Sequence, residues 1–285
     1  MIGDLNLKIF THPCLYLVTE EDVSNGRSTV EVSKEAIKGG IDVLQMREKR
    51  KSYGERSILG RELSRSCKEQ GVLFIVNDDP ILAKEVDADG VHLGQEDIEE
   101  WTLERTRNII GRDRIIGLST HSIEQVRQAN SFDVDYIAFG PVFPTQTKDY
   151  YIGTEDVSTV LRLATKPIVL IGGITLDNVD VLLEKGAENI AVIRAITQAE
   201  NIASRVQELK ERIVGNGAKM MIRVNGKEES VEIGSTLQDL VTHKGFKIDH
   251  IVVEHNSNLV PPEEWGSTDI KYNDVIEIIS FVGGG

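Results

Sequence analysis

The chain has 285 residues, enough for one large domain and a small second one. Its formal net charge of -14 argues against non-specific nucleic-acid binding, which needs a basic surface that displaces counterions. No apolar run approaches the length of a membrane span, and the N-terminus lacks the basic and apolar regions of a signal peptide. We therefore expect a cytoplasmic protein without nucleic-acid or membrane partners. An anionic small substrate remains compatible with the composition, provided that basic side chains converge locally.

The two cysteines show neither metal-ligand spacing nor a disulfide framework. Cys14 lies in a strand-like run and Cys67 in a helical segment, so both are predicted to be buried thiols.

Short apolar runs alternate with helical segments over most of the chain. The intervening segments, such as 53–70, 123–130 and 176–185, carry apolar residues at helical spacing. Eight such strand-helix units predict an α/β fold of the (β/α)₈ (TIM) barrel type, closed by a helix over about 198–214. A doubly wound open sheet is the alternative, but no glycine-rich fingerprint follows the first run. The predicted strands cover residues 15–18, 43–46, 73–76, 91–93, 115–118, 136–139, 168–171 and 190–193.

The pattern changes after residues 215–219, which are predicted to link a barrel domain at 1–214 to a small domain at 220–285. A hairpin, a helix and further strands predict an α+β domain of the ubiquitin-like (β-grasp) type. Its predicted elements are strands 220–224 and 230–233 around an Asn225-Gly226 turn, a helix over 236–244 with Ser235 as N-cap, and strands 251–253 and 275–279.

Two acidic residues follow neighbouring predicted strands. Asp78 comes directly after strand 73–76, and Asp97 follows strand 91–93 after a short loop. Because parallel strands end at the same edge of a sheet, the two carboxylates can meet there and bind Mg²⁺ together with water and a substrate phosphate. The alternative is that Asp78 and the preceding Asn77 cap one helix and Asp97 the next.

Basic residues follow the second predicted strand. Gln45, Arg47 and Lys49 alternate along an extended segment and share one face. An arginine fork and an ammonium on one face suit a diphosphate. The alternative is a solvated edge whose charges point to water.

Further candidate phosphate ligands follow the sixth and seventh strands. A rigid turn presents Thr145, Thr147 and Lys148. Gly172 and Gly173 expose backbone N–H groups where a helix is expected to begin, a frequent phosphate site in such barrels. The alternative for the glycines is tight packing between strand and helix.

These motifs, in this order and spacing, resemble thiamine-phosphate synthase over almost the whole barrel. The resemblance rests on segments 45–49, 77–78, 90–97, 140–148 and 171–174. It implies condensation of hydroxymethylpyrimidine diphosphate with thiazole phosphate, which yields thiamine phosphate and pyrophosphate, with Mg²⁺ as cofactor. No dedicated nucleophile is required, because the aminopyrimidine can stabilise a cation at its methylene carbon.

The resemblance also implies roles for individual residues, with Asp78 and Asp97 as Mg²⁺ ligands. The other roles that it implies are diphosphate binding by Arg47, Lys49, Asn77 and Lys148; contact with the pyrimidine by Gln45 and Ser119, with His92 near the same pocket; and thiazole phosphate binding by Thr145, Thr147, Gly173, Ile193 and Arg194.

Two positions depart from the family pattern. Asp79 stands where many members have Arg, and Arg194 stands where a small residue such as Ser is expected. His121 leaves another function open, because related thiazole tautomerases use a His near this position as general acid or base. Those relatives lack the metal carboxylates and the Thr-x-Thr-Lys segment. A barrel without activity that only tethers the small domain is the remaining alternative.

From residue 220 onward the sequence resembles the sulfur-carrier protein of thiazole synthesis. It ends in segment 281–285, whose last three residues are glycines. A tail without side chains can enter a narrow active-site channel, although terminal glycines are also often just disordered. The resemblance implies that an activating enzyme adenylates the Gly285 carboxylate, which becomes a thiocarboxylate that supplies sulfur to thiazole synthase. We therefore expect a fusion of synthase and sulfur carrier, and the sequence leaves a monomer or a homo-oligomer open.

Overall fold

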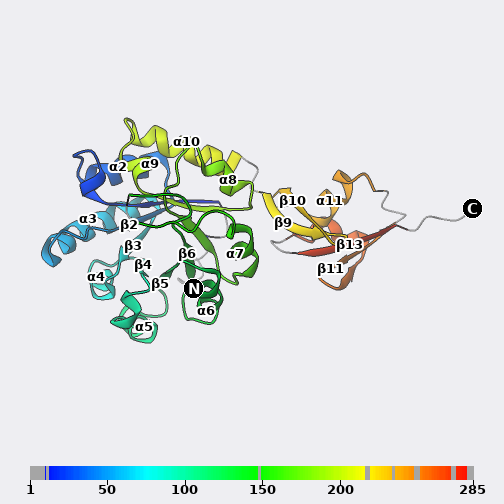
Figure 1. Ribbon diagram of the computed structural model, residues 1–285, viewed down its shortest axis with the longest axis horizontal. Coiled ribbons are helices and arrows are strands. Elements are labelled where there is room, and N and C mark those ends of the chain that lie inside the picture. The colour runs from blue at the N-terminus through cyan, green and yellow to red at the C-terminus, as the bar shows by residue number, and fades with distance from the viewer. Residues whose placement is uncertain are drawn as a thin grey trace, which may run out of the picture. The chain divides into compact units, whose positions relative to one another are not determined.

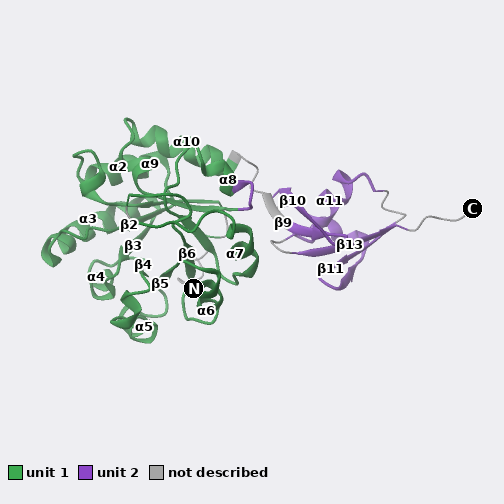
Figure 2. Ribbon diagram, viewed as in Figure 1, with its two compact units in different colours: residues 1–182, 187–215 green, residues 183–186, 216–285 purple. Residues whose placement is uncertain are grey.

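The computed structural model describes residues 10, 13–146, 149–215, 219–232, 235–246, 251–270 and 274–280. The chain divides into two compact units, residues 1–182 with 187–215 and residues 183–186 with 216–285 (Figure 2). Each unit has a hydrophobic core of its own. Cys14 and Cys67 are free and buried, as predicted.

The larger unit is a closed barrel of eight parallel strands, which confirms the predicted fold and excludes the open sheet. Figure 1 shows its helices on the outside of the ring of strands. The strands are β1 (Cys14–Val18), β2 (Val43–Met46), β3 (Leu73–Asn77), β4 (Gly90–Leu93), β5 (Ile115–Thr120), β6 (Tyr136–Phe139), β7 (Ile168–Ile171) and β8 (Asn189–Val192). The helices are α2 (Thr29–Gly39), α3 (Tyr53–Gln70), α4 (Pro80–Glu85), α5 (Leu103–Ile110), α6 (Ile123–Ala129), α7 (Val157–Leu163), α8 (Val179–Leu183), α9 (Arg194–Thr197) and α10 (Ile202–Gly215), with short 3₁₀ turns η2 (Glu21–Val23) and η3 (Asp97–Glu99).

Local sequence explains where the first helices begin. Ser28 and Glu31 form a capping box at the start of α2, and Ser52 and Glu55 form one at the start of α3. In each box the Ser hydroxyl and the Glu carboxylate satisfy backbone N–H groups that the first helical turn leaves unpaired. Helix α3 ends at Gly71, whose left-handed φ of 70° is strained for other residues.

Two expectations about helices near the site are wrong. The closing helix does not begin at residue 198 but at Ile202, because the separate short helix α9 precedes it and Asn201 accepts from the Ser204 N–H at 3.0 Å. No helix begins directly at Gly172 and Gly173 either. Helix α8 starts only at Val179, after a turn that intervenes.

Strand side chains alternate between the barrel interior and the surrounding helices. Val43 and Ile75 lie in the interior cluster. Gln45 and Asn77 lie two residues further along the same strands and therefore also face inward, at the carboxyl-terminal mouth of the barrel. The cluster comprises Phe10, Cys14, Tyr16, Val18, Val43, Leu73, Ile75, Ile115, Tyr136, Val169 and Ala191.

Aspartates at the other end of the barrel serve the sheet itself. Asp42, Asp89 and Asp135 each precede a strand and accept a hydrogen bond from a backbone N–H of the preceding strand, at 2.8, 2.8 and 2.7 Å. These carboxylates satisfy backbone donors that the ladder leaves unpaired. Their structural role separates them from the acidic residues at the mouth.

The smaller unit is a mixed five-stranded sheet with strand order β10-β9-β13-β11-β12, which confirms the predicted ubiquitin-like class. Its helix is capped by Thr236 and not by Ser235, because Thr236 and Asp239 form a capping box. Trp265 is fully buried in the core. Among the helices that the structure describes, none is both long and apolar enough to cross a membrane. The elements are β9 (Lys219–Val224), β10 (Lys227–Glu232), α11 (Leu237–His243), β11 (Ile251–His255), β12 (Asn258–Val260), η5 (Pro262–Ser267) and β13 (Val275–Ser280).

Candidate active site

A cavity of about 450 Å³ opens among the carboxyl-terminal ends of the barrel strands and the loops that follow them. Thr147, Lys148 and Gly285 lie outside the described residues. Every other candidate site residue lines the cavity, namely Gln45, Arg47, Lys49, Asn77, Asp78, His92, Asp97, Ser119, Thr145, Gly173, Ile193 and Arg194.

The two predicted metal ligands lie together on one side of this cavity. Asp78 has a left-handed φ of 65°, and its backbone N–H donates to the His92 carbonyl oxygen at 2.8 Å. Burial, followed by a hydrogen bond to Asp97 and repulsion from its charge, raises the pKa of Asp78 to about 7, against the opposing effect of Lys49. Two oxygen-ligand carboxylates that repel each other without a cation suit a divalent ion such as Mg²⁺.

The helix-capping alternative for these residues is wrong. Asp79, not Asp78, caps α4 by accepting from the Leu82 N–H at 2.9 Å. Asp97 does not cap the next turn, because its Oδ2 accepts from the Gly94 N–H at 2.8 Å, on the preceding loop. Asp79 also lies 3.4 Å from Arg56, so its charge has a partner outside the carboxylate pair.

Within the described part of the chain, the carboxylate pair is not part of a larger cluster of metal ligands. Among the residues that the structure describes, no three His, Cys, Asp or Glu side chains cluster as metal ligands do. Two protein carboxylates fit Mg²⁺, which keeps several waters and binds substrate phosphate oxygens, better than a metal that needs a complete protein cage.

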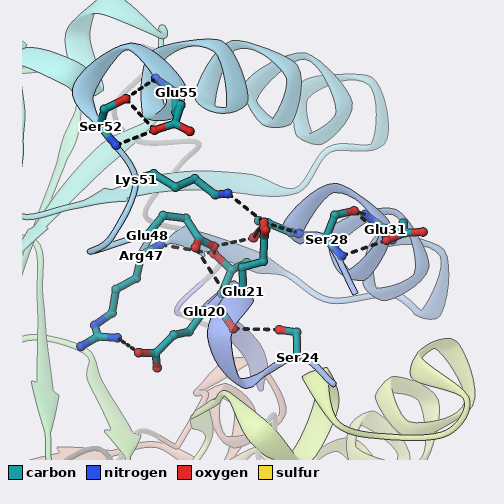
Figure 3. Close-up of polar contacts among 12 residues, drawn as sticks. Glu20, Glu21, Ser24, Ser28, Glu31, Arg47, Glu48, Lys51, Ser52 and Glu55 are labelled. Carbon is teal, nitrogen blue, oxygen red and sulfur yellow. Dashed lines mark hydrogen bonds and ion pairs between the residues drawn. The ribbon is translucent and has the colours of Figure 1, made fainter. Parts of the chain in front are cut away.

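Arg47 lies on the wall of the cavity and is held by an acidic partner. Its Nη1 is 3.0 Å from Glu20 Oε1, and Figure 3 shows the guanidinium reaching toward that carboxylate. The Arg47 side chain is 17% exposed, whereas that of Lys49 is 55% exposed. The alternative that these charges point to water is therefore wrong for Arg47, whereas it fits the more exposed Lys49. Lys49 Nζ lies 3.8 Å from Asp78 Oδ2.

The buried carboxylate of Glu48 anchors this segment from the opposite face. It accepts hydrogen bonds from Thr19 Oγ1 at 3.1 Å, Thr29 Oγ1 at 2.5 Å and the Glu21 N–H at 3.2 Å. Thr19 Oγ1 in turn accepts from the Arg47 N–H at 3.3 Å. These contacts fix the alternation that turns Arg47 toward the cavity.

A line of hydrogen bonds crosses the cavity near its buried end. Gln45 Nε2 donates to the Tyr16 hydroxyl at 2.8 Å, which lies 2.9 Å from the Tyr136 hydroxyl. The latter is 2.8 Å from His92 Nδ1, and His92 Nε2 is 2.9 Å from Ser119 Oγ. Burial raises the pKa of both tyrosines and lowers that of His92 to about 4.

Sequence analysis missed the two tyrosines of this line. Tyr16 and Tyr136 stand at interior positions of strands whose other residues are all apolar. A buried tyrosine hydroxyl requires a hydrogen-bond partner, so a Tyr at such a position was the available signal.

The predicted phosphate loop after β7 is built on close packing. Gly172 and Gly173 have left-handed φ values of 102° and 67°. A Cβ at Gly172 would lie 2.3 Å from Pro141 Cβ, and one at Gly173 would lie 2.3 Å from the Pro144 carbonyl oxygen. Both glycines therefore allow close packing, but against the loop after β6 and not between strand and helix as the alternative supposed, and Gly173 still lies on the cavity surface.

His121 also lines the cavity and has a defined tautomer. Its Nδ1 lies 2.5 Å from the Gly140 carbonyl oxygen, which can only accept, so Nδ1 carries the hydrogen. The ring meets Tyr150 edge-on, with 6.0 Å between centroids.

Comparison with known proteins agrees with this geometry. Residues 15–196 match the family described as thiamine monophosphate synthase, and residues 222–285 match the ThiS family. The thiamine-phosphate synthase of Persephonella marina is 42% identical over 198 residues, which cover 69% of this chain and 93% of that protein. That of Haloarcula marismortui is 39% identical over 205 residues, which cover 70% and 96%.

A solved structure extends the comparison to three dimensions. Thiamine phosphate pyrophosphorylase from Pyrococcus furiosus superposes with a TM-score of 0.65 at 34% identity, over 73% of this chain and 97% of that one. Taken with the cavity at the barrel mouth, these matches show that the chain belongs to the thiamine monophosphate synthase family and carries a C-terminal domain of the ThiS family.

Proposed function

We propose that the barrel condenses hydroxymethylpyrimidine diphosphate with thiazole phosphate to give thiamine phosphate and pyrophosphate. One observation carries the proposal. A carboxylate pair, a cationic wall formed by Arg47 and Lys49, and buried polar groups line a single cavity in a member of this family. The relatives that carry the name thiamine-phosphate synthase support it.

The diphosphate belongs at the cationic wall. Arg47 and Lys49 bind its oxygens, together with Asn77 and Lys148. Asp78 and Asp97 would hold Mg²⁺, which would supply positive charge to the diphosphate oxygens. The approach of Lys49 to Asp78, 3.8 Å between Nζ and Oδ2, brings cationic and metal-binding groups to the same substrate moiety.

The reaction needs no protein nucleophile. The bond between the methylene carbon and the diphosphate oxygen breaks, and its electron pair leaves with pyrophosphate. The thiazole nitrogen then donates its lone pair to the methylene carbon. The protein contributes by positioning the two substrates and by stabilising the departing negative charge.

The two substrates occupy different walls of the cavity. Gln45 and Ser119 contact the pyrimidine, in the pocket that His92 helps to form. The thiazole phosphate binds at the loops after β6, β7 and β8, through Thr145, Thr147, Gly173, Ile193 and Arg194. Arg194 adds a cation where the family pattern has a small residue, which suits a second phosphate group.

A thiazole tautomerase is the second candidate, because His121 lines the same cavity. Its Nδ1–H is engaged by the Gly140 carbonyl oxygen, which leaves Nε2 as a base. The carboxylate pair has no role in that reaction. Loss of synthase activity on replacement of Asp97 therefore separates the two functions.

The test is the initial rate of thiamine phosphate formation by the full-length chain and its variants. Asp97→Asn and Arg47→Ala are expected to lower kcat/KM by about a hundredfold or more, because Arg47→Ala removes a cation that stabilises the leaving group and Asp97→Asn weakens binding of the Mg²⁺ that would do the same. Asp113→Asn is the matched control, since Asp113 is exposed and remote from the cavity. Equal rates in all four proteins would refute the proposal, and absence of product with the parent would favour the tethering alternative.

For the small domain we propose a sulfur-carrier role with Gly285 as the modified residue. An activating enzyme joins AMP from ATP to the Gly285 carboxylate and releases pyrophosphate, and a sulfur donor then displaces AMP to leave a thiocarboxylate for thiazole synthase. The match of residues 222–285 to the ThiS family supports this role.

Intact-mass measurement after incubation with such an enzyme, ATP and a sulfur donor should show replacement of one oxygen by sulfur. A chain that lacks Gly285 should show none, and an unchanged mass of the parent would contradict the proposal.

A further inference from the structure

Five side chains from different strands form one unbroken line of hydrogen bonds in the cavity. In order they are Gln45, Tyr16, Tyr136, His92 and Ser119, with neighbouring polar atoms 2.8 to 2.9 Å apart. Gln45 and Ser119, at the two ends, are the groups assigned above to the pyrimidine. The three middle residues hold those ends, and above only His92 was given a place in the pyrimidine pocket.

Counting hydrogens fixes the direction of every bond in the line. Each tyrosine hydroxyl has one hydrogen, and a neutral imidazole has one N–H. Because Gln45 Nε2 donates to Tyr16, the Tyr16 hydrogen must go to Tyr136. Tyr136 must then donate to His92 Nδ1, which leaves the His92 Nε2–H to donate to Ser119. With the Gln45 amide in this orientation, any other arrangement leaves a buried hydrogen without an acceptor, at a cost of about 1–3 kcal/mol.

We infer that Tyr16, Tyr136 and His92 form a directional relay that sets the Gln45 Oε1 as an acceptor and the Ser119 hydroxyl as a donor toward the cavity. The three are positioning residues, because they act on the substrate only through the two ends. The inference rests on the proposed function for its substrate but not for its geometry.

The resulting pattern matches an aminopyrimidine. The exocyclic amino group donates to the Gln45 oxygen, and a ring nitrogen accepts from Ser119. A pyrimidinone, which presents a carbonyl oxygen and a ring N–H, requires the opposite pattern. To present an N–H of Gln45 to a carbonyl oxygen, the amide must turn and every bond of the relay must reverse, whereas the Ser119 oxygen can accept a second hydrogen bond without any reversal. The relay therefore makes the pocket specific for the amino form.

The surroundings of the relay are built to keep Tyr136 in place. A Cβ at Gly117 would lie 2.1 Å from Tyr136 Cζ and 2.4 Å from its hydroxyl oxygen, so only glycine leaves room for the ring. Phe10 stacks on that ring with 4.8 Å between centroids, and the His92 ring stacks on it at 5.5 Å. Such confinement allows the hydroxyl little choice of partner.

The first test is the tautomer of His92 in the full-length protein without substrate. Nitrogen-15 shifts of the six histidines, assigned with His92→Gln, should show His92 protonated on Nε2 and not on Nδ1. Protonation on Nδ1 would overturn the relay as drawn. Because no turnover is needed, failure of the proposed function leaves this measurement valid.

The second test reverses the relay from its far end. Gln45→Glu, measured at pH 8, replaces the donor by an acceptor, so the hydrogens of Tyr16, Tyr136 and His92 should all turn round. His92 should then carry its hydrogen on Nδ1. Gln146→Glu places the same charge elsewhere on the cavity lining and should leave Nε2 protonated. Retention of the Nε2 tautomer in Gln45→Glu would refute transmission.

The third test links the relay to substrate choice. Tyr136→Phe interrupts the line and keeps the ring. It should raise KM for the aminopyrimidine diphosphate about tenfold, the effect of one hydrogen bond, while KM for thiazole phosphate changes less than about twofold. It should also lower the preference for the amino over the oxo pyrimidine diphosphate. The control is Tyr53→Phe on α3, which removes a hydroxyl that donates to Glu85 on α4. Equal changes in both KM values, with the preference intact, would reduce Tyr136 to a structural residue.

Discussion

Replacement of one carboxylate at the metal site should make the metal-free protein more stable. In Asp78→Asn the side chain keeps its size and its tolerance of the left-handed backbone, φ 65° at this position, but loses its charge. Without a cation, burial raises the pKa of Asp78 to about 7, with further contributions from its hydrogen bond to Asp97 and from repulsion between the two carboxylates. The wild-type pair is therefore a cost to folding that only a bound cation removes.

The size and the pH dependence of this cost follow from the pKa. The unfolded chain loses the proton near the ordinary value of 3.8, whereas the folded, metal-free protein keeps it up to about pH 7. The parent's free energy of unfolding therefore falls as pH rises through this window and stays low above it. The two pKa values differ by about three units, and each unit corresponds to about 1.4 kcal/mol, so the parent loses at most about 4 kcal/mol of its free energy of unfolding. Because the Asp78 side chain is 29% exposed, solvent screening reduces this loss. We expect about half of the maximum, or about 2 kcal/mol.

The assay is calorimetric unfolding of the full-length chain in EDTA at pH 8 and pH 5.5. At pH 8, Asp78→Asn should raise the melting temperature of the barrel by about 4–8 °C. This range follows from a gain of about 2 kcal/mol in the free energy of unfolding, since each kcal/mol shifts the melting temperature of a domain of this size by about 2–4 °C. At pH 5.5 the gain should fall to roughly half, because the folded carboxyl is still protonated there. Adding Mg²⁺ at pH 8 should raise the melting temperature of the parent and not that of the variant.

Asp113→Asn provides the comparison for loss of one negative charge on an acidic protein, since Asp113 is exposed. If Asp78→Asn gave the same shift as Asp113→Asn, or lowered the melting temperature equally at both pH values, the two carboxylates would not be repelling each other. The metal-site argument would then be wrong.

Gly117→Ala should lower the melting temperature of the barrel by overpacking against Tyr136, at about 1–3 kcal/mol, and thermal unfolding followed by circular dichroism measures it. Glu48→Gln should lower the free energy of unfolding by about 1–3 kcal/mol, because one amide oxygen cannot accept from all three donors, and chemical denaturation measures it. The same change should raise KM for the diphosphate substrate in steady-state kinetics, because Arg47 is held less firmly. Thr236→Ala should destabilise the small domain by about 1 kcal/mol through loss of its capping box, as calorimetry would show, and leave the synthase rate unchanged.

The barrel was predictable because its signals are local. Each strand is a short run of apolar residues, and the predicted bounds differ from the observed ones by no more than two residues. The position of the cavity residues followed from topology, since parallel strands end together and Asp78 and Asp97 come from adjacent strands β3 and β4. The small domain was predictable for the same reason, through its Asn225-Gly226 hairpin.

Features that depend on side-chain partners could not be read from the chain. Pro80 directly after Asp79 is a signal for a helix start that favours Asp79 as the cap, but the cavity position of Asp78 depends on contacts that the sequence does not show. The partnership of Arg47 with Glu20 joins residues from two different loops. The tyrosine relay likewise depends on the packing of β1 against β6 across the barrel interior, a contact between residues 120 apart in the chain.

The most direct test of the central claim is to mix the purified full-length chain with hydroxymethylpyrimidine diphosphate and thiazole phosphate, and to follow thiamine phosphate and pyrophosphate by chromatography with Mg²⁺ or with EDTA. Both products should form in equal amounts with Mg²⁺, and EDTA should abolish them. Well-folded protein that forms neither product, or that forms them equally fast in EDTA, would contradict the proposed synthase function.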